Sequence, residues 1–358
     1  MICYNCFNKK LKRGVIMNRK IIDAIIRKAK RVCPDSLALI GIYGSVATGD
    51  TYEKYDLDLL ILIEDDDGYK LATGFILEDN NVGYDIYCTK LDDLRHDAEC
   101  YHAHLSKLMD SKIVYVQNQD AYNELCKLRD KVVLFLKSEE RFFRVKELLD
   151  KAKISYADAC LHDELGQVRM DAFHVIDCIL NAIMLYHGKY FRLGVKRTFD
   201  EIANLPVSDE FSDNMRKIAA SKKVSEIRDL LKSLLLYVES YTHRENPKSE
   251  PSAVLTGTYE ELYSNWRNKV EEAADNSDVF SGFANMCCFN YMLSGISSEF
   301  NIGDYNVIDE YNPENLTDNV RLYDKYLYKY EKVCNKAGIK IKRFSDVDAF
   351  VADYLENQ

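Results

Sequence analysis

Three aspartates in two apolar segments are the side chains of this sequence best suited to chemistry. Asp56 precedes the apolar run 57–63, Asp58 lies within it, and Asp85 interrupts the run 82–88. Residues two apart on a strand share one face, and two ionised carboxylates side by side repel each other unless a cation lies between them. With Asp85 on a neighbouring strand, the three carboxylates would form an oxygen cluster that suits Mg²⁺. Such a cluster can hold two metal ions and promote an in-line displacement at phosphorus.

The dipeptide Gly44-Ser45 follows the apolar run 37–43 and supplies the second half of the pattern. A strand that turns through Gly-Ser into a helix directs backbone N–H groups and the helix N-terminus at an anion. Glycine lets the backbone come close to a phosphate, and Ser45 adds a hydroxyl donor. We therefore expect a triphosphate to lie between this turn and the metal ions.

The combined pattern resembles the nucleotidyltransferase superfamily of DNA polymerase β type. That family has an apolar residue with Gly-Gly or Gly-Ser, a spacer, Asp-x-Asp or Asp-x-Glu on a strand, and a later strand aspartate. The matching positions are Tyr43-Gly44-Ser45, Asp56-Leu57-Asp58 and Asp85, within a motif region that covers residues 37–90.

Within the superfamily, the chain looks most like bacterial enzymes that modify antibiotics such as aminoglycosides or lincosamides. Those enzymes join a catalytic domain to a helical domain, and the stretch from Gln167 to Tyr190 is similar to their helical domains. Two positions depart from the family, since Thr48 stands where many members have arginine and Tyr55 where many have serine. These differences leave the nucleotide contacts and the substrate class open.

The resemblance implies an enzyme that transfers NMP, in the first instance AMP from ATP, to a hydroxyl group of a small molecule and releases pyrophosphate. Asp56 and Asp58 would ligate both Mg²⁺ ions, and Asp85 would ligate the catalytic ion and accept the hydroxyl proton. Asp163 and Glu164 are weaker candidates for the base. The nucleotide-binding candidates are Gly44, Ser45, Thr48 and, by their position in the helical domain only, Lys189, Lys196 and Arg197.

Short apolar strands separated by helical stretches must position these residues, which predicts an α+β fold. The strands are expected at 37–43, 57–63, 82–88 and 113–116. They predict a nucleotidyltransferase catalytic domain at 32–125, with a small mixed sheet flanked by helices, followed by an all-α C-terminal region. Long amphipathic stretches at 122–149, 154–187 and 208–242 predict a helical substrate-binding domain at 126–245. A proline-containing linker, 245–251, separates it from a C-terminal helical region at 252–358.

Residues 1–31 form a separate basic segment, with ten Lys/Arg and the single acid Asp23. We expect a mainly solvated amphipathic helix that buries Ile21, Ile22 and their neighbours. Met17 is an alternative start, in which case the preceding residues would lie outside the fold.

The chain has 358 residues and a net charge of −10, so it lacks the strongly basic balance of proteins that bind long nucleic acids. We expect a small-molecule partner, with a cationic one favoured by the charge. No run approaches 18 apolar residues, which excludes a membrane span. The 11 cysteines and the lack of a secretory signal predict free thiols in the cytoplasm. Both a monomer and a homodimer are compatible with the sequence.

Two alternatives stay open. The same chemistry on a protein side chain or a tRNA end would make the chain a toxin-like or RNA-modifying enzyme. Alternatively, the chain would be a non-catalytic nucleotide-binding interaction module whose partner binds the tyrosine-rich C-terminal region.

Overall fold

The computed structural model describes residues 4–49, 57–79, 81–244, 250–303 and 305–356, with the backbone alone for residues 4–17. The chain divides into two compact units, Met1–His243 and Arg244–Gln358. None of the helices in the described ranges is long and apolar enough to cross a membrane.

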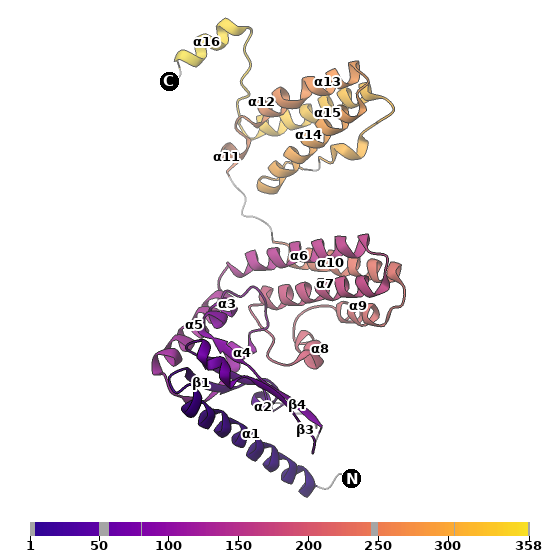
Figure 1. Cartoon of the computed structure of the whole chain (residues 1–358). Coiled ribbons are helices and arrows are strands. Elements are labelled where there is room, and N and C mark those ends of the chain that lie inside the picture. Colours follow the sequence, from indigo (N-terminus) through magenta and orange to yellow (C-terminus); the bar gives the residue numbers. More distant parts are fainter. Residues whose placement is uncertain (1–3, 50–56, 80, 245–249, 304, 357–358) are drawn as a thin grey trace. The chain divides into compact units, whose positions relative to one another are not determined.

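The first unit contains a four-stranded mixed sheet in the order β5-β2-β1-β6. Figure 1 labels β1 of this sheet next to α1. Strand β1 (Leu37–Ile42) pairs antiparallel with β2 (Leu59–Ile63) and with the edge strand β6 (Lys112–Val116). Strand β5 (Cys88–Lys90) pairs parallel with β2. The mixed sheet and the all-α region that follows it confirm the predicted fold class.

The predicted strand 82–88 is wrong as a single element. It divides at Tyr87 into β4 (Val82–Ile86) and β5, because β4 pairs with β3 (Thr73–Leu77) in a separate hairpin while β5 joins β2. Strand β3 has no counterpart in the prediction. The 3₁₀ segment η1 (Asp66–Leu71) connects β2 to this hairpin.

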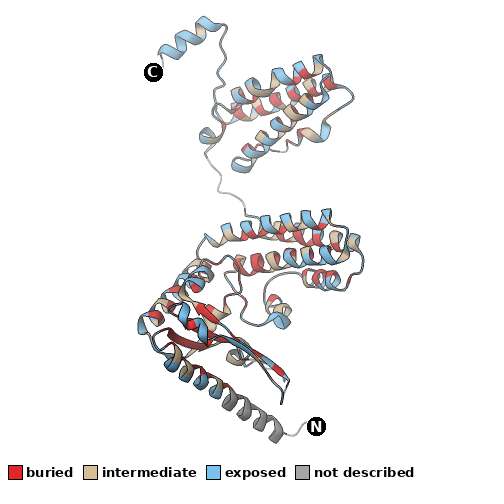
Figure 2. Ribbon diagram, in the orientation of Figure 1, coloured by how far each residue is buried: buried red, intermediate tan, exposed pale blue. Residues whose placement is uncertain are grey.

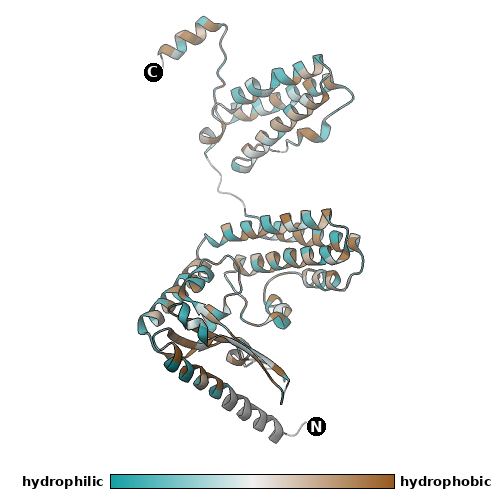
Figure 3. Cartoon of the chain, in the orientation of Figure 1, coloured by the Kyte–Doolittle hydropathy of each residue, from teal (hydrophilic) through white to brown (hydrophobic). Residues whose placement is uncertain are grey.

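Helices cover both faces of the four-stranded sheet. Helix α1 (Tyr4–Val32) buries Ile22, Ile25 and Ala29 against one face, which confirms the predicted amphipathic helix. Helices α3 (Leu91–Asp97), α4 (Ser106–Asp110) and α5 (Gln119–Lys137) share a hydrophobic cluster with the opposite face. In Figures 2 and 3 the strands between these layers are the most buried and apolar part of this region.

The rest of the first unit is helical, but its helices are shorter than the predicted stretches. The stretch 122–149 divides at Ser138, whose N–H and hydroxyl both donate to the carbonyl of Phe135 at 2.9 Å and so end α5. Beyond this break lie α6 (Arg141–Leu161), α7 (Leu165–Tyr186), η2 (Val195–Arg197), α8 (Thr198–Ile202), α9 (Asp209–Ala220) and α10 (Val224–Thr242).

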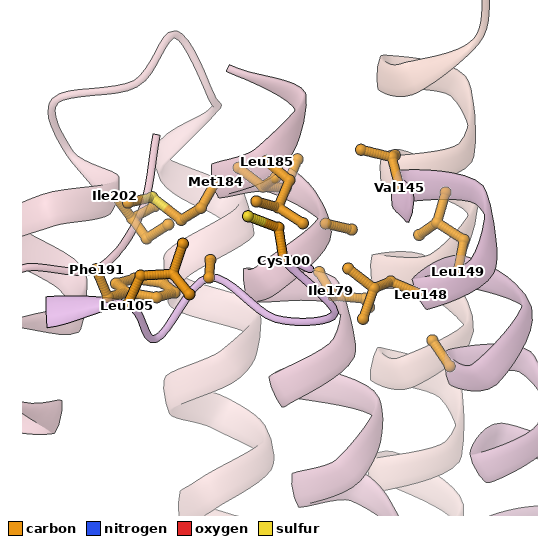
Figure 4. Packing of buried hydrophobic residues seen from close by; sticks show 14 of the residues in the cluster. Cys100, Leu105, Val145, Leu148, Leu149, Ile179, Met184, Leu185, Phe191 and Ile202 are labelled. Atoms are coloured by element: carbon orange, nitrogen blue, oxygen red, sulfur yellow. The ribbon is translucent and has the colours of Figure 1, made fainter. Parts of the chain in front are cut away.

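Buried contacts join α7 to the loop that follows α3. The side-chain oxygen of Asn181 accepts a hydrogen bond from the Ala103 N–H at 2.6 Å, and the Phe191 N–H donates to the Ala103 carbonyl at 2.8 Å. Figure 4 shows the apolar side of this junction, where Met184 lies near Ile202 and Phe191 near Leu105. The C-terminal end of α7 is thereby fixed beside the sheet-containing part of the unit.

The second unit is helical and has its own core. Phe289 stacks on the buried Tyr323 with ring centroids 3.9 Å apart. Its elements are α11 (Pro251–Leu255), α12 (Thr258–Leu262), the π-helical η3 (Tyr263–Arg267), α13 (Asn268–Asp275), α14 (Val279–Glu299), η4 (Val307–Glu310), α15 (Leu316–Lys336) and α16 (Val347–Glu356).

Candidate functional site

Alternation along β2 divides its side chains between the two faces of the sheet. Leu59 and Ile61 pack with α1, whereas Leu60 and Leu62 belong to the cluster on the opposite face. The sequence predicted Asp58 within the strand, but β2 begins one residue later, at Leu59. The same alternation nevertheless places Asp58 on the face of Leu60. We call this surface the Leu60 face.

Gly44 and Asp58 are in direct contact at the end of β1. The N–H of Tyr43 donates to the Asp58 carbonyl at 3.1 Å, so the pairing of β1 with β2 extends one residue beyond both strands. Gly44 has a φ of +66°, and a Cβ built on it would lie 1.9 Å from Oδ2 of Asp58. A side chain at position 44 would therefore both strain the backbone and displace this carboxylate.

Asp85 lies on the Leu60 face as well. Its neighbours Tyr84 and Ile86 are buried in the cluster next to α1, so Asp85, which is exposed, projects from the other side of β4. The parallel pair Ile61 and Cys88 sets the register between β2 and β5. Asp58 and Asp85 each lie three residues before this first pair. The strand that carries Asp85 is nevertheless paired with β3, outside the four-stranded sheet.

Two tyrosines join the segments that carry these carboxylates. The hydroxyl groups of Tyr43 and Tyr87 lie 2.7 Å apart in a hydrogen bond. Tyr43 directly precedes Gly44, and Tyr87 follows Asp85 by two residues, so it projects from the same face as Asp85. The hydrogen bond thus joins the segment of the Gly44-Ser45 turn to the segment that carries Asp85.

The turn itself begins the one-turn helix α2 (Gly44–Thr48). Ser45 is half-buried at its start. The Thr48 hydroxyl donates to the carbonyls of Gly44 and Ser45 at 3.1 and 3.3 Å, so these bonds lie within the helix. At the other end, the Lys112 ammonium donates to the Ala47 carbonyl. These bonds hold the turn in place beside the carboxylates.

Comparison with protein families found a match for part of the chain. Residues 19–155 match the model of the nucleotidyltransferase domain. The chain therefore carries a nucleotidyltransferase domain, and it is an enzyme that transfers nucleotidyl groups. The matched range begins within α1, ends within α6 and includes all six strands. Comparison with curated proteins found no match for the chain.

The predicted metal site is only partly covered by the described residues. Asp56, one of the three predicted ligands, lies outside the described residues. Within those residues, no group of three or more His, Cys, Asp or Glu side chains could hold a metal ion. Asp58 and Asp85 do offer carboxylate oxygens on a common face, which is the donor type that Mg²⁺ prefers.

The cations predicted from the helical part have other contacts. Lys189 donates to the Asn204 carbonyl at 3.4 Å, and Arg197 forms an ion pair with Asp200 at 3.0 Å. Lys196 is exposed in η2. The contacts of Lys189 and Arg197 are with residues that follow α7.

The weaker base candidates, Asp163 and Glu164, lie in the loop between α6 and α7. Asp163 forms an ion pair with Arg228 at 3.3 Å. Glu164 is 17 residues before Asn181, which corresponds to about 25 Å along a helix at 1.5 Å per residue. The end of α7 that is fixed beside the nucleotidyltransferase domain is therefore the opposite one.

Residues of α4 that sequence reasoning missed lie beside this site, since α4 contacts α2. Asp110 accepts hydrogen bonds from Tyr190 at 3.1 Å and Arg192 at 3.2 Å, which joins α4 to the segment after α7. Burial, followed by the nearby Asp110 carboxylate, raises the pKa of Tyr190 to about 12, so its hydroxyl stays protonated as a donor. Lys107, three residues earlier, contacts both Asp97 and Tyr87.

Proposed function

We propose that the chain transfers NMP, with AMP from ATP as the first candidate, to a hydroxyl group of a small molecule and releases pyrophosphate. One observation supports this proposal: the Gly44-Ser45 turn contacts the Asp58 carboxylate, and the Tyr43–Tyr87 hydrogen bond joins the turn to the segment that carries Asp85. A phosphate-binding turn beside carboxylates is the arrangement that a metal-dependent transfer of a nucleotidyl group requires.

Asp58, Asp85 and, from the sequence pattern, Asp56 would hold Mg²⁺. When bound, the metal would neutralise phosphate charge and polarise the phosphorus centre. The contact with Gly44 supports this role because position 44 has no side chain that would occupy the space of the Asp58 carboxylate. Carboxylate oxygens are the ligands that distinguish such a site from a soft-metal site.

The protein's own residues would orient the phosphate chain and accept a proton. Ser45 and the backbone of the turn would orient the phosphate chain, and Asp85, which is exposed, would accept the proton of the acceptor hydroxyl. The new bond joins that hydroxyl oxygen to the α-phosphorus, and the bond from the α-phosphorus to the bridging oxygen of pyrophosphate breaks. The electron pair of that bond leaves with pyrophosphate.

The acceptor surface is proposed on α7. Oδ1 of Asp177 lies 3.3 Å from Nε2 of His104, so this face of α7 is directed at the loop before α4. Met170 and Phe173 lie on the same helical face as Asp177 and are 58% and 59% exposed. An acid next to exposed apolar side chains suits an acceptor that is cationic and partly apolar, such as an aminoglycoside or lincosamide antibiotic.

The decisive experiment measures pyrophosphate release from each of the four NTPs with Mg²⁺ and a panel of aminoglycosides, lincosamides and simple polyols. We expect release with one class of acceptor, and a loss of about a hundredfold or more in D58N. The matched control is D92N, which removes a carboxylate of α3 that pairs with Arg95 on the surface. Equal release by D58N and the wild type would refute the assignment of Asp58. Release that requires a protein or RNA acceptor would refute the small-molecule assignment.

A further inference from the structure

Cations are scarce in the part of the chain that must bind a triphosphate. Residues 32–125 contain six Lys/Arg and 19 Asp/Glu. One of the six, Lys54, lies outside the described residues. Three others pair with surface acids of the same region, and the fourth caps α2: these pairs are Lys70 with Asp67, Lys90 with Asp66, Arg95 with Asp92 and Lys112 with the Ala47 carbonyl.

Lys107 is the remaining cation of this segment among the described residues. It lies in α4, which contacts α2. Its ammonium nitrogen is 3.7 Å from Oδ2 of Asp97 and 5.9 Å from the ring centroid of Tyr87. Its side chain is only 23% exposed. The lysine is thus packed between an acid and an aromatic ring instead of extending into solvent.

Tyr87 relates this ammonium group to the carboxylates. Its hydroxyl bonds to that of Tyr43, whose N–H donates to the Asp58 carbonyl. Tyr87 and Asp85 are two residues apart on one face of an extended segment, which puts their Cα atoms about 7 Å apart. The ammonium over the Tyr87 ring therefore lies beside the surface that carries both carboxylates.

The contact with Asp97 leaves Lys107 able to bind a ligand. A separation of 3.7 Å is longer than an N–H···O hydrogen bond, so Asp97 attracts the ammonium without occupying its three donors. A triphosphate adds several negative charges next to Asp58 and Asp85. In a region where acids outnumber bases three to one, a partly buried cation beside the turn offsets this repulsion more than an exposed one.

We propose that Lys107 binds the phosphate chain of the nucleotide, with Asp97 and Tyr87 as the residues that position it. This inference rests on the proposed nucleotidyl transfer and adds a phosphate-binding residue to it. Lys107 is thereby added to Lys189, Lys196 and Arg197, the residues that the sequence suggested for the same role.

The test is equilibrium binding of ATP and of inorganic tripolyphosphate to the full chain, with EDTA and then with Mg²⁺. We expect K107M to weaken the binding of both probes about tenfold, because a hydrogen-bonded charge is lost. Binding of AMP should change less than that of ATP, and K107R should recover part of the affinity. The matched control is K131M, which removes a lysine of α5 that pairs with Glu99 on the surface. This variant should bind both probes like the wild type.

The outcomes separate this inference from the proposed function. Should the wild type bind ATP and release pyrophosphate while K107M binds both probes equally well, Lys107 has no phosphate-binding role and the proposed function stands. A wild type that neither binds ATP nor releases pyrophosphate refutes the proposed function and the role of Lys107 with it. Thermal unfolding of K107M within a few degrees of the wild type establishes that weaker binding is not caused by unfolding. D97N, which keeps the lysine, should lower the affinity less than K107M.

Discussion

The absence of a side chain at Gly44 is what allows the carboxylate of Asp58 to lie against the turn. A Cβ on Gly44 would lie 1.9 Å from Oδ2 and 2.7 Å from the carboxyl carbon of Asp58. The two halves of the sequence pattern, which are separated along the chain, are therefore one contact in the folded protein. This contact explains why a glycine is needed there for reasons beyond backbone freedom.

Replacement of Gly44 should damage the site more than the fold. G44A would strain a backbone with φ +66°, at a cost of roughly 1 kcal/mol, and would also displace the Asp58 carboxylate. We expect pyrophosphate release to fall by about a hundredfold. The matched control is G49A, since Gly49 has a φ of +79° but nothing within 4 Å of an added Cβ. Equal losses of activity in the two variants would contradict the role of the contact.

The hydrogen bond between Tyr43 and Tyr87 should couple the two segments energetically. Y43F and Y87F each remove one hydroxyl of the 2.7 Å pair, and each should lower the free energy of unfolding by about 1 kcal/mol. The double variant should cost less than the sum of the two, because the second substitution has no bond left to break. Denaturant titration of all four proteins measures this coupling. Strict additivity would mean that the bond contributes nothing.

Removal of the Asp177 carboxylate should weaken the binding of the acceptor and leave the binding of the nucleotide unchanged. D177N keeps the size of the side chain but removes the charge that faces His104. With a cationic acceptor we expect the KM for the acceptor to rise about tenfold, while the KM for the NTP stays unchanged. The control is D158N, which removes an exposed acid of α6. A rise in the KM for the NTP alone would contradict the proposed acceptor surface.

Two histidines should make the fold sensitive to mild acid. Burial lowers the pKa of His102, against the opposing effect of Asp97, and burial followed by Lys189 and Arg141 lowers that of His187. The unfolded chain then binds protons more readily than the folded one, so the free energy of unfolding should fall as the pH drops below about 6.5. Thermal unfolding between pH 7.5 and 5.5 measures this loss. H102N should show a smaller loss, and an unchanged pH dependence would contradict this account.

Local patterns determined most of the catalytic motif in advance. Gly44-Ser45 follows an apolar run, and Asp58 and Asp85 interrupt two others, so the sequence alone predicted strands, a turn and carboxylates that share a face. The mixed sheet and the nucleotidyltransferase domain are confirmed. Strand β3 was missed because its sequence, Thr-Gly-Phe-Ile-Leu, has no buried residue to make it stand out as a core strand.

The tertiary structure decided which distant residues surround that motif. The number of Lys/Arg between 32 and 125 distinguishes no residue among them, whereas the packing of α4 beside α2 and Tyr87 distinguishes Lys107. The apolar run 82–88 also did not show that β5 would pair with β2 while β4, which carries Asp85, would pair with β3. Alternation and turn formation depend on neighbours in sequence, so they can be read from it. The meeting of residues 43, 58, 87 and 107 depends instead on how separate segments bury their apolar surfaces together, and the folded chain alone determines that.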